Sequence, residues 1–220
     1  MIVAASWSGG KDSCLACHKA MQEGHVVACL VNFISQQHRR VSFHGVPADL
    51  ILEQARSVEI PLLQRETSGG DYEEQFRHAV KSLVERGIEG MVFGDVYLQE
   101  HRDWVERMCS NVGLKVLEPL WGMDARDVYS RFINLGFDAI VVSAKSDLIG
   151  KEWVGRHLDR RFLGFLERSG IDVCGENGEY HTFVIDGPIF KRRISILDKE
   201  VVLREKNWYA DLQRYATELK

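Results

Sequence analysis

Alternation of short apolar runs with stretches of helical periodicity is the feature that most restricts the fold of this chain. In the first 121 residues, the apolar runs predict strands at 2–6, 25–34, 60–66, 90–96 and 114–121. The stretches between them predict helices at 12–23, 48–58, 71–86 and 97–112. Strands that alternate with helices of this length favour parallel pairing, because a parallel connection needs a crossover. We therefore predict an α/β fold, an open parallel sheet with helices on both faces.

The rhythm changes from about Trp121 onwards. Helices are predicted at 124–135 and 154–167, with an apolar strand at 138–144 between them. Two β-rich runs, "RRISIL" and "EVVLRE", follow and are joined by Asp198 and Lys199. This pattern predicts a second, smaller α/β or α+β domain, so we divide the chain into residues 1–121 and 122–220.

Composition limits the functional classes. The chain of 220 residues is long enough for one large domain or two small ones, and its formal net charge of −4 gives no general attraction to nucleic acid. No apolar run approaches the roughly 20 residues that span a bilayer. The start "MIVAASW" lacks the basic region of a signal peptide. We expect a cytoplasmic protein that has no membrane partner, and a homo-oligomer is compatible with the sequence.

The stretch "SGGKDS" lies between the first predicted strand and the first predicted helix. Gly9 and Gly10 allow the backbone to approach phosphate oxygens, and the first helical turn offers unpaired N–H groups. Ser8 and Ser13 supply hydroxyl groups, and Lys11 supplies a cation. The alternative is an ordinary turn in which Ser8 caps the helix and the Lys11 side chain is solvated.

The Walker A pattern does not fit this stretch. Its first glycine position holds Ala5, and Asp12 follows Lys11 where Ser or Thr is required. "SGGKDS" instead resembles the signature of the PP-loop ATP pyrophosphatases, which cleave ATP between the α and β phosphates. The resemblance implies that the loop amides and Lys11 hold the departing pyrophosphate. It also implies Mg²⁺, for which Asp12 is a candidate ligand, although a first-turn Asp also favours the helix dipole.

Four later stretches sharpen this resemblance: "SFHGVPADLILEQARSVEIPL", "VFGDVYLQEHRDWVERMCSNVGLKVLEPLW", "LIGKEWVGRHLD" and "CGENGEYHTFVIDGPIF". Together with "SGGKDS" they resemble the diphthine–ammonia ligase (diphthamide synthase) family of PP-loop ATPases. The resemblance implies a PP-loop ATP-binding domain at 1–121 and an acceptor-substrate domain at 122–220. It also implies that ATP and ammonium convert the diphthine carboxylate of the translocating elongation factor into an amide, with release of AMP and pyrophosphate.

The motif "ENGEYHT" departs from the family pattern Glu-Gly-Gly-Glu-Tyr/Phe-Glu-Thr at Asn177 and His181. This variant is similar to a bacterial branch linked to cobalamin salvage, so a small corrinoid acid is the alternative acceptor. The acidic and histidine side chains of this motif suit catalysis. Glu176 or Glu179 can accept ammonium or ligate Mg²⁺, and His181 can act as a general base. The structural alternative is a type I′ hairpin turn at Asn177 and Gly178. From this stretch, the predicted substrate contacts are Glu176, Asn177, Glu179, Tyr180 and Thr182.

Further candidates come from outside these two motifs. Gly94 and Asp95 end the fourth predicted strand, where ligands bind in open α/β sheets, so Asp95 is predicted to contact ribose or Mg²⁺ or to cap the next helix. His44 and Arg156 are predicted substrate contacts, with exposed surface positions as the alternative. His101, on the following helix, either reaches the cleft or lies on a solvated face.

Two other functions remain open at this stage. Cys14 and Cys17 form a CxxC, which suits a tRNA-thiolating PP-loop enzyme. Packing inside the helix is the favoured explanation of the pair, and no second CxxC completes a zinc site. A nucleotide-binding sensor without catalysis is the second alternative, because a fold and a loop alone do not establish chemistry.

Overall fold

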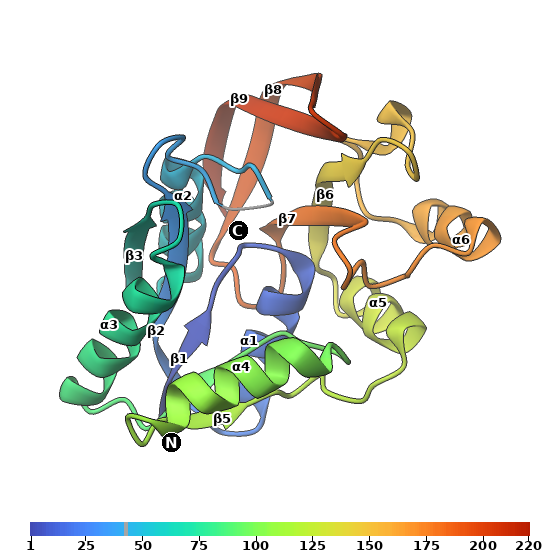
Figure 1. The fold of residues 1–220 in the computed structure, drawn as a ribbon. Coiled ribbons are helices and arrows are strands. Elements are labelled where there is room, and N and C mark those ends of the chain that lie inside the picture. Colours follow the sequence, from blue (N-terminus) through green and yellow to red (C-terminus); the bar gives the residue numbers. More distant parts are fainter. Residues whose placement is uncertain (42–43) are drawn as a thin grey trace.

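The computed structural model describes residues 1–41 and 44–220, and its first half is a five-stranded parallel sheet (Figure 1). The strand order is β3-β2-β1-β4-β5, which confirms the predicted open α/β sheet. The chain builds outwards from β1 to β3 and then returns to the other side of β1. The elements are β1 (Ile2–Ser6), α1 (Lys11–Gln22), β2 (Val26–Ser35), α2 (Ala48–Val58), β3 (Leu62–Thr67), α3 (Tyr72–Glu85), β4 (Gly90–Val92), α4 (Gln99–Ser110) and β5 (Lys115–Leu117).

Helices cover both faces of this sheet, as the apolar pattern predicts. Successive side chains of a strand point to opposite faces, and in β1 the side chains of Val3 and Ala4 belong to different hydrophobic cores. Ala4 packs with α3 and α4 residues such as Phe76. Val3 packs in the core that contains α1 and α2, including Leu15.

The second half forms an antiparallel sheet of four strands in the order β7-β6-β9-β8. Its elements are α5 (Ala125–Asn134), β6 (Asp138–Lys145), a 3₁₀ turn (Lys151–Trp153), α6 (Arg160–Ser169), β7 (Tyr180–Asp186), β8 (Arg192–Arg204) and β9 (Asn207–Leu219). This arrangement is α+β. Its buried side chains, such as Phe183, share one core with α1 and α2, so α1 lies between the two sheets (Figure 1). The division at 121/122 stays a prediction.

Two predicted elements of the second half are wrong. The helix expected at 154–167 begins only at Arg160, because Asp159 caps it by accepting hydrogen bonds from the amides of Arg161 and Phe162. The chain before it is extended and bridges to β6 through His157 and Ile140.

The turn expected at Asp198 and Lys199 is also wrong. Both residues lie inside β8, where the register against β9 shifts in a bulge, and the chain reverses at Glu205 and Lys206 instead. Glu205 has a φ of 53°. Among the described residues, no helix is long and apolar enough to cross a membrane.

Candidate active site

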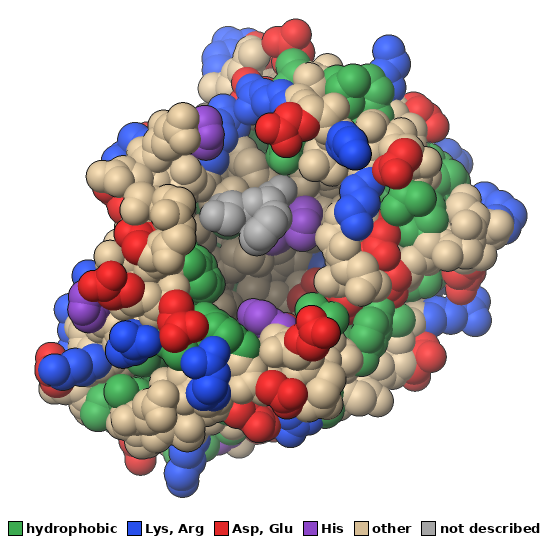
Figure 2. All heavy atoms as spheres, viewed as in Figure 1, with side chains coloured by type: hydrophobic (Ala, Val, Ile, Leu, Met, Phe, Trp, Pro, Cys, Tyr) green, Lys and Arg blue, Asp and Glu red, His purple; other side chains and the backbone are tan. Residues whose placement is uncertain are grey.

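A cavity of about 310 Å³ lies where β1 and β4 end, at the point where the chain order of the parallel sheet reverses. Figure 2 shows this face of the molecule hollowed near its centre, with histidine side chains at the rim. Both halves of the chain contribute to the lining. Of the predicted site residues, those that line it are Ser8, Gly10, Lys11, Asp12, Ser13, His44, Gly94, Asp95, Glu176, Tyr180, His181 and Thr182.

Glycines allow the loop after β1 to pack closely against its surroundings. Gly9 has a φ of 81°, and a Cβ there would lie 2.7 Å from Oε1 of Gln54. A Cβ at Gly94 would lie 2.8 Å from the backbone carbon of Asp12. The end of β4 therefore touches the first turn of α1, and any side chain at residue 94 would separate them.

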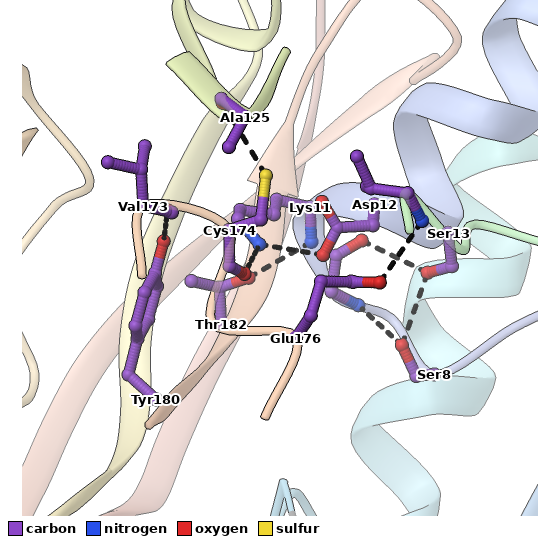
Figure 3. A network of polar contacts seen from close by, with 12 residues as sticks. Ser8, Lys11, Asp12, Ser13, Ala125, Val173, Cys174, Glu176, Tyr180 and Thr182 are labelled. Atoms are coloured by element: carbon purple, nitrogen blue, oxygen red, sulfur yellow. Dashed lines mark hydrogen bonds and ion pairs between the residues drawn. The ribbon is translucent and has the colours of Figure 1, made fainter. Parts of the chain in front are cut away.

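The second half of the chain holds the loop in this shape (Figure 3). Thr182 in β7 accepts a hydrogen bond from the amide of Lys11 through Oγ1, at 3.0 Å. The amide of Val184 donates to the carbonyl of Gly9 at 2.9 Å. Within the loop, the Ser8 hydroxyl accepts from the amide of Gly10 at 3.3 Å. A strand from the second sheet is thus part of the loop's own hydrogen-bond network.

Lys11 is buried and lies at the centre of a polar network rather than in solvent (Figure 3). Its Nζ lies 2.6 Å from Oδ2 of Asp12 and 2.5 Å from the carbonyl oxygen of Cys174, and 5.2 Å from the ring centroid of Tyr180. Burial is the largest single effect and would lower the pKa of Lys11, but the charge and hydrogen bond of Asp12, with contributions from Cys174 and Glu176, together outweigh it and raise that pKa above its ordinary value. The cation is therefore retained, and the solvated alternative for Lys11 is wrong.

Acidic side chains also line this cavity. Oδ1 of Asp12 is buried and has no hydrogen-bond partner among the described residues. Oε2 of Glu176 accepts from the amide of Val96 at 3.1 Å. Burial, with a contribution from the nearby Asp12 charge, raises the pKa of Glu176 to about 7. Asp95 is engaged differently, since its Oδ1 lies 2.5 Å from Nδ1 of His101.

Two histidines form the wall beside β7. The rings of His44 and His181 contact each other with centroids 4.5 Å apart. Nδ1 of His44 lies 3.1 Å from the Thr182 carbonyl oxygen; a carbonyl only accepts, so Nδ1 must carry the proton. Burial lowers the pKa of His44 to about 4, and the Lys11 charge adds to this effect. The pKa of His181 is lowered for the same reasons, with His44 contributing.

Four predicted residues lie outside the lining of this cavity. Gly9 is buried behind it. The Arg156 side chain is exposed, with its guanidinium 5.4 Å from the Trp153 ring centroid, and the carbonyl of the exposed Asn177 accepts a hydrogen bond from Lys145. Oε2 of Glu179 is buried and has no hydrogen-bond partner among the described residues. The nucleotide-binding role of Gly9 and the substrate roles of the other three stay predictions.

The structural alternative for this motif, a type I′ hairpin turn at Asn177 and Gly178, is wrong. A type I′ turn needs a positive φ at both central residues, and of these two only Gly178 has one, at 76°. The amide of Gly178 donates to the carbonyl of Gly175, so the segment is a turn that leads from a coil into β7. The loop thereby brings Glu176 to the cavity.

A second cavity of about 910 Å³ adjoins the first and was not anticipated from the sequence. It opens at the ends of β1, β2 and β3, and aromatic side chains line it: Trp7, Phe33, Tyr72 and Trp104. His101 lines both cavities, so of its two alternatives the cleft-facing one holds. His101 pairs with Asp95, six residues earlier in the sequence, across the connection from β4 to α4. This acid and histidine at the two ends of one connection are the signal that could have indicated the position of His101.

Cys14 and Cys17 are fully buried, and burial raises the pKa of both thiols. A thiol that stays protonated is a poor nucleophile. Among the described residues, no group of three or more His, Cys, Asp or Glu side chains is arranged to hold a metal ion. The structure therefore favours packing as the role of this pair.

The fold and the site define a class: an α/β protein with an anion-binding loop at the switch point of a parallel sheet, of the PP-loop type. The model described as "Diphthamide synthase N-terminal domain" matches residues 1–116, and "Diphthamide synthase C-terminal domain" matches residues 124–218. The chain therefore belongs to the diphthamide synthase family, which confirms the resemblance seen in the sequence.

Two named relatives support this family assignment. "Diphthine--ammonia ligase" from Bos taurus is 30% identical, with 96% of this chain and 88% of the relative covered. The Homo sapiens protein of the same name is 29% identical with the same coverage. A solved structure described as a predicted subunit of tRNA methyltransferase from Methanocaldococcus jannaschii covers 86% of this chain and 98% of its own, at 14% identity and a TM-score of 0.45. That likeness is too low to bear on activity.

Proposed function

We propose that this chain is an ATP-dependent ligase that converts a carboxylate into its amide with ammonia, and that diphthine on an elongation factor is the acceptor. The observation that carries the proposal is the loop at residues 8–13, which faces acidic and histidine side chains of the second half across one cavity. The names of the relatives favour this activity over tRNA thiolation, a corrinoid acceptor and a sensor without catalysis.

Adenylation gives the carboxylate the good leaving group that amide formation needs. A carboxylate resists attack by ammonia because its leaving group would be oxide. Attack of the carboxylate oxygen on the α-phosphorus of ATP breaks the bond to the β-phosphate, and pyrophosphate leaves with the electron pair. Lys11 and the first turn of α1 lie where they would stabilise that departing charge. Ammonia then displaces AMP from the activated acyl group.

The two adjoining cavities suit the two ends of ATP. The aromatic cavity fits the base and ribose, because Tyr72 and Trp104 in its lining keep part of their ring surface exposed. The polar cavity fits the phosphates. The unpartnered Oδ1 of Asp12 is where Mg²⁺ would bind, and the ion would neutralise phosphate oxygens. The Asp95 carboxylate already has His101 as its partner.

In this proposal, residues of β7 and of the coil that precedes it act in the second step, the attack of ammonia on the activated acyl group. Glu176 lies in the cavity with a pKa near neutrality, which suits a group that accepts a proton from the attacking nitrogen. His181 remains the other candidate base, and Tyr180 and Thr182 shape the wall beside it. Glu179 stays a predicted contact for ammonium.

Mass spectrometry of the acceptor tests the proposal. Diphthine-bearing elongation factor, ATP, magnesium and ammonium are incubated with the enzyme, and the modified residue is analysed for conversion of acid to amide. We expect conversion that depends on both ATP and ammonium, and none with a Lys11→Ala variant. A corrinoid acid is run in parallel. Amidation of that acid but not of diphthine would reject the proposed acceptor and keep the ligase class.

A further inference from the structure

The polar and aromatic cavities meet along a shared wall. Both are lined by Ser6, Ser8, His44, Leu98 and His101. The serines come from the end of β1, whereas Leu98 and His101 come from the start of α4. A ligand that fills both cavities must pass this wall.

The inference rests on the proposed function in one respect, which is that ATP occupies both cavities. The group that joins the nucleoside to the terminal diphosphate is the α-phosphate, so it is this phosphate that passes the shared wall. The α-phosphorus is also the atom attacked during adenylation. Residues of the shared wall are therefore placed beside the reacting centre rather than beside the leaving pyrophosphate.

The His101 ring is fixed in two directions. Its Nδ1 lies 2.5 Å from Oδ1 of Asp95; the carboxylate accepts, so Nδ1 carries the proton of this bond. One face of the ring stacks on Trp104, with centroids 5.9 Å apart and an interplanar angle of 14°. The negative charge of Asp95 favours the imidazolium form of this ring, in which Nε2 carries a second proton. Nε2 is the remaining polar atom and has no hydrogen-bond partner among the described residues.

We propose that His101 contacts the α-phosphate of ATP through Nε2 and stabilises the charge that develops on its oxygens during adenylyl transfer. His101 donates a hydrogen bond and exchanges no electrons: the acceptor oxygen forms the new bond to phosphorus, and pyrophosphate leaves with the old one. Asp95 is a positioning residue, which fixes the ring and supplies a balancing negative charge.

His44 does not share this role, although it lies on the same wall. Nδ1 of His44 donates a hydrogen bond to the Thr182 carbonyl. Nε2 of a neutral His44 then presents a lone pair, which is unfavourable towards a phosphate oxygen. The two histidines of the shared wall are thus distinguished by their partners, a carboxylate for His101 and a carbonyl for His44.

Binding of ATP fragments tests the proposal without the acceptor. Affinities for adenosine, AMP and pyrophosphate are measured by calorimetry on the wild type, His101→Ala and His101→Gln. We expect His101→Ala to weaken AMP binding by about 10- to 100-fold, as for a lost charge-assisted hydrogen bond, with adenosine and pyrophosphate unchanged. We expect His101→Gln to recover part of the AMP affinity. The control is His157→Ala, which breaks a similar pair with Asp138, at 2.6 Å, away from both cavities.

A second readout uses the two diastereomers of ATP that carry sulfur on the α-phosphorus. The wild type should favour one of them, and His101→Ala should lose much of that preference. Equal weakening of adenosine and AMP, weakening of pyrophosphate alone, or an unchanged diastereomer preference would each overturn the proposal. Failure of the proposed function looks different: the wild type itself would then bind neither ATP nor AMP.

Discussion

Lys11 carries a positive charge in a position with little access to water. Asp12 and the Cys174 carbonyl hold it there, so the cation is already desolvated when a phosphate arrives. Electrostatic attraction is stronger in such a site than at the surface. The side chain is therefore not a surface charge, and the partner that we propose for it is a phosphate oxygen.

Replacing Lys11 by alanine should weaken binding of both ATP and pyrophosphate by about 10- to 100-fold. Calorimetry measures the two affinities, and a thermal melt shows whether the variant is folded. Lys19→Ala is the matched control, because Lys19 is on the same helix and pairs with Glu23 at 3.7 Å, outside the cavity lining. Unchanged pyrophosphate affinity in Lys11→Ala would contradict this role.

Glu176 should make stability depend on pH in a direction opposite to that of an ordinary ion-paired acid. Its pKa rises from 4.5 to about 7 on folding, so the folded state holds the proton more tightly than the unfolded state does. The contribution to stability is present below pH 4.5 and is lost as the pH rises through 7.

Glu176→Gln should consequently increase the free energy of unfolding at pH 8 by about 1–3 kcal/mol and change it little at pH 4. The amide oxygen can still accept from the amide of Val96. Urea unfolding at the two pH values measures the difference. Equal effects at both values would show that Glu176 titrates normally.

The sequence predicted the residues of the phosphate loop, because glycine, serine and lysine at fixed spacing carry a local meaning. It did not decide between alternatives that depend on distant partners. The burial of Lys11 depends on Cys174, and the orientation of His101 depends on Trp104 and Asp95. Such pairings arise only when the chain has folded.

At the level of elements, Gly94 sets the distance between β4 and α1. A Cβ at Gly94 would lie 2.8 Å from the backbone carbon of Asp12 and 2.9 Å from the amide nitrogen of Ser13. Backbone atoms cannot move aside as a flexible side chain can, so α1 itself would have to shift.

Gly94→Ala should lower the free energy of unfolding by about 1–3 kcal/mol and weaken ATP binding as well. Denaturant unfolding and ATP titration measure the two effects. Gly69→Ala is the control, since a Cβ at Gly69 meets nothing within 4 Å and its φ is not in the left-handed region. If Gly94→Ala behaves as Gly69→Ala does, the close approach of residue 94 to α1 is not needed for stability or for ATP binding.

Gln54 connects α2 to the loop and to β7. It is fully buried, accepts from the Trp7 indole at 2.7 Å, and donates to the carbonyls of Gly9 at 3.0 Å and Val184 at 2.6 Å. These contacts use every hydrogen-bonding group of the amide apart from one lone pair of its oxygen.

Gln54→Ala leaves the Trp7 indole N–H unpaired, which should cost about 1–3 kcal/mol and also reduce ATP affinity through the loop. Tyr129→Phe is a matched control, because it removes a part-buried hydrogen bond to the Asp159 carbonyl and none made by the loop itself. We expect the control to lose stability but keep its ATP affinity. Equal ATP affinity in both variants would show that Gln54 does not support the loop.

The parallel sheet was predictable because its strands are apolar runs bounded by helices. The second sheet was less so. The β8 strand is rich in charged residues and largely exposed, so a polar pair inside it, Asp198 and Lys199, resembled a turn. The β-rich runs of β8 were visible in the sequence, but the bulge that carries the strand through Asp198 and Lys199 depends on its pairing with β9.

At the scale of the whole molecule, the site exists only because the two sheets are folded together. One hydrophobic core runs from the first sheet through α1 to β6 and β7. The loop after β1 is closed by Thr182 and Val184 from the second sheet. The residues that we propose for the nucleotide and for the acceptor therefore line one cavity, which suits a reaction whose intermediate must not reach water.

The nucleotide product of the reaction tests the central claim most directly. ATP labelled at the α-phosphate is incubated with the enzyme, magnesium, ammonium and diphthine-bearing elongation factor, and the labelled product is separated. The loop at residues 8–13 predicts AMP, formed in step with amide. Labelled ADP, with no AMP, would contradict the account, because it would place the cleaved bond between the β and γ phosphates.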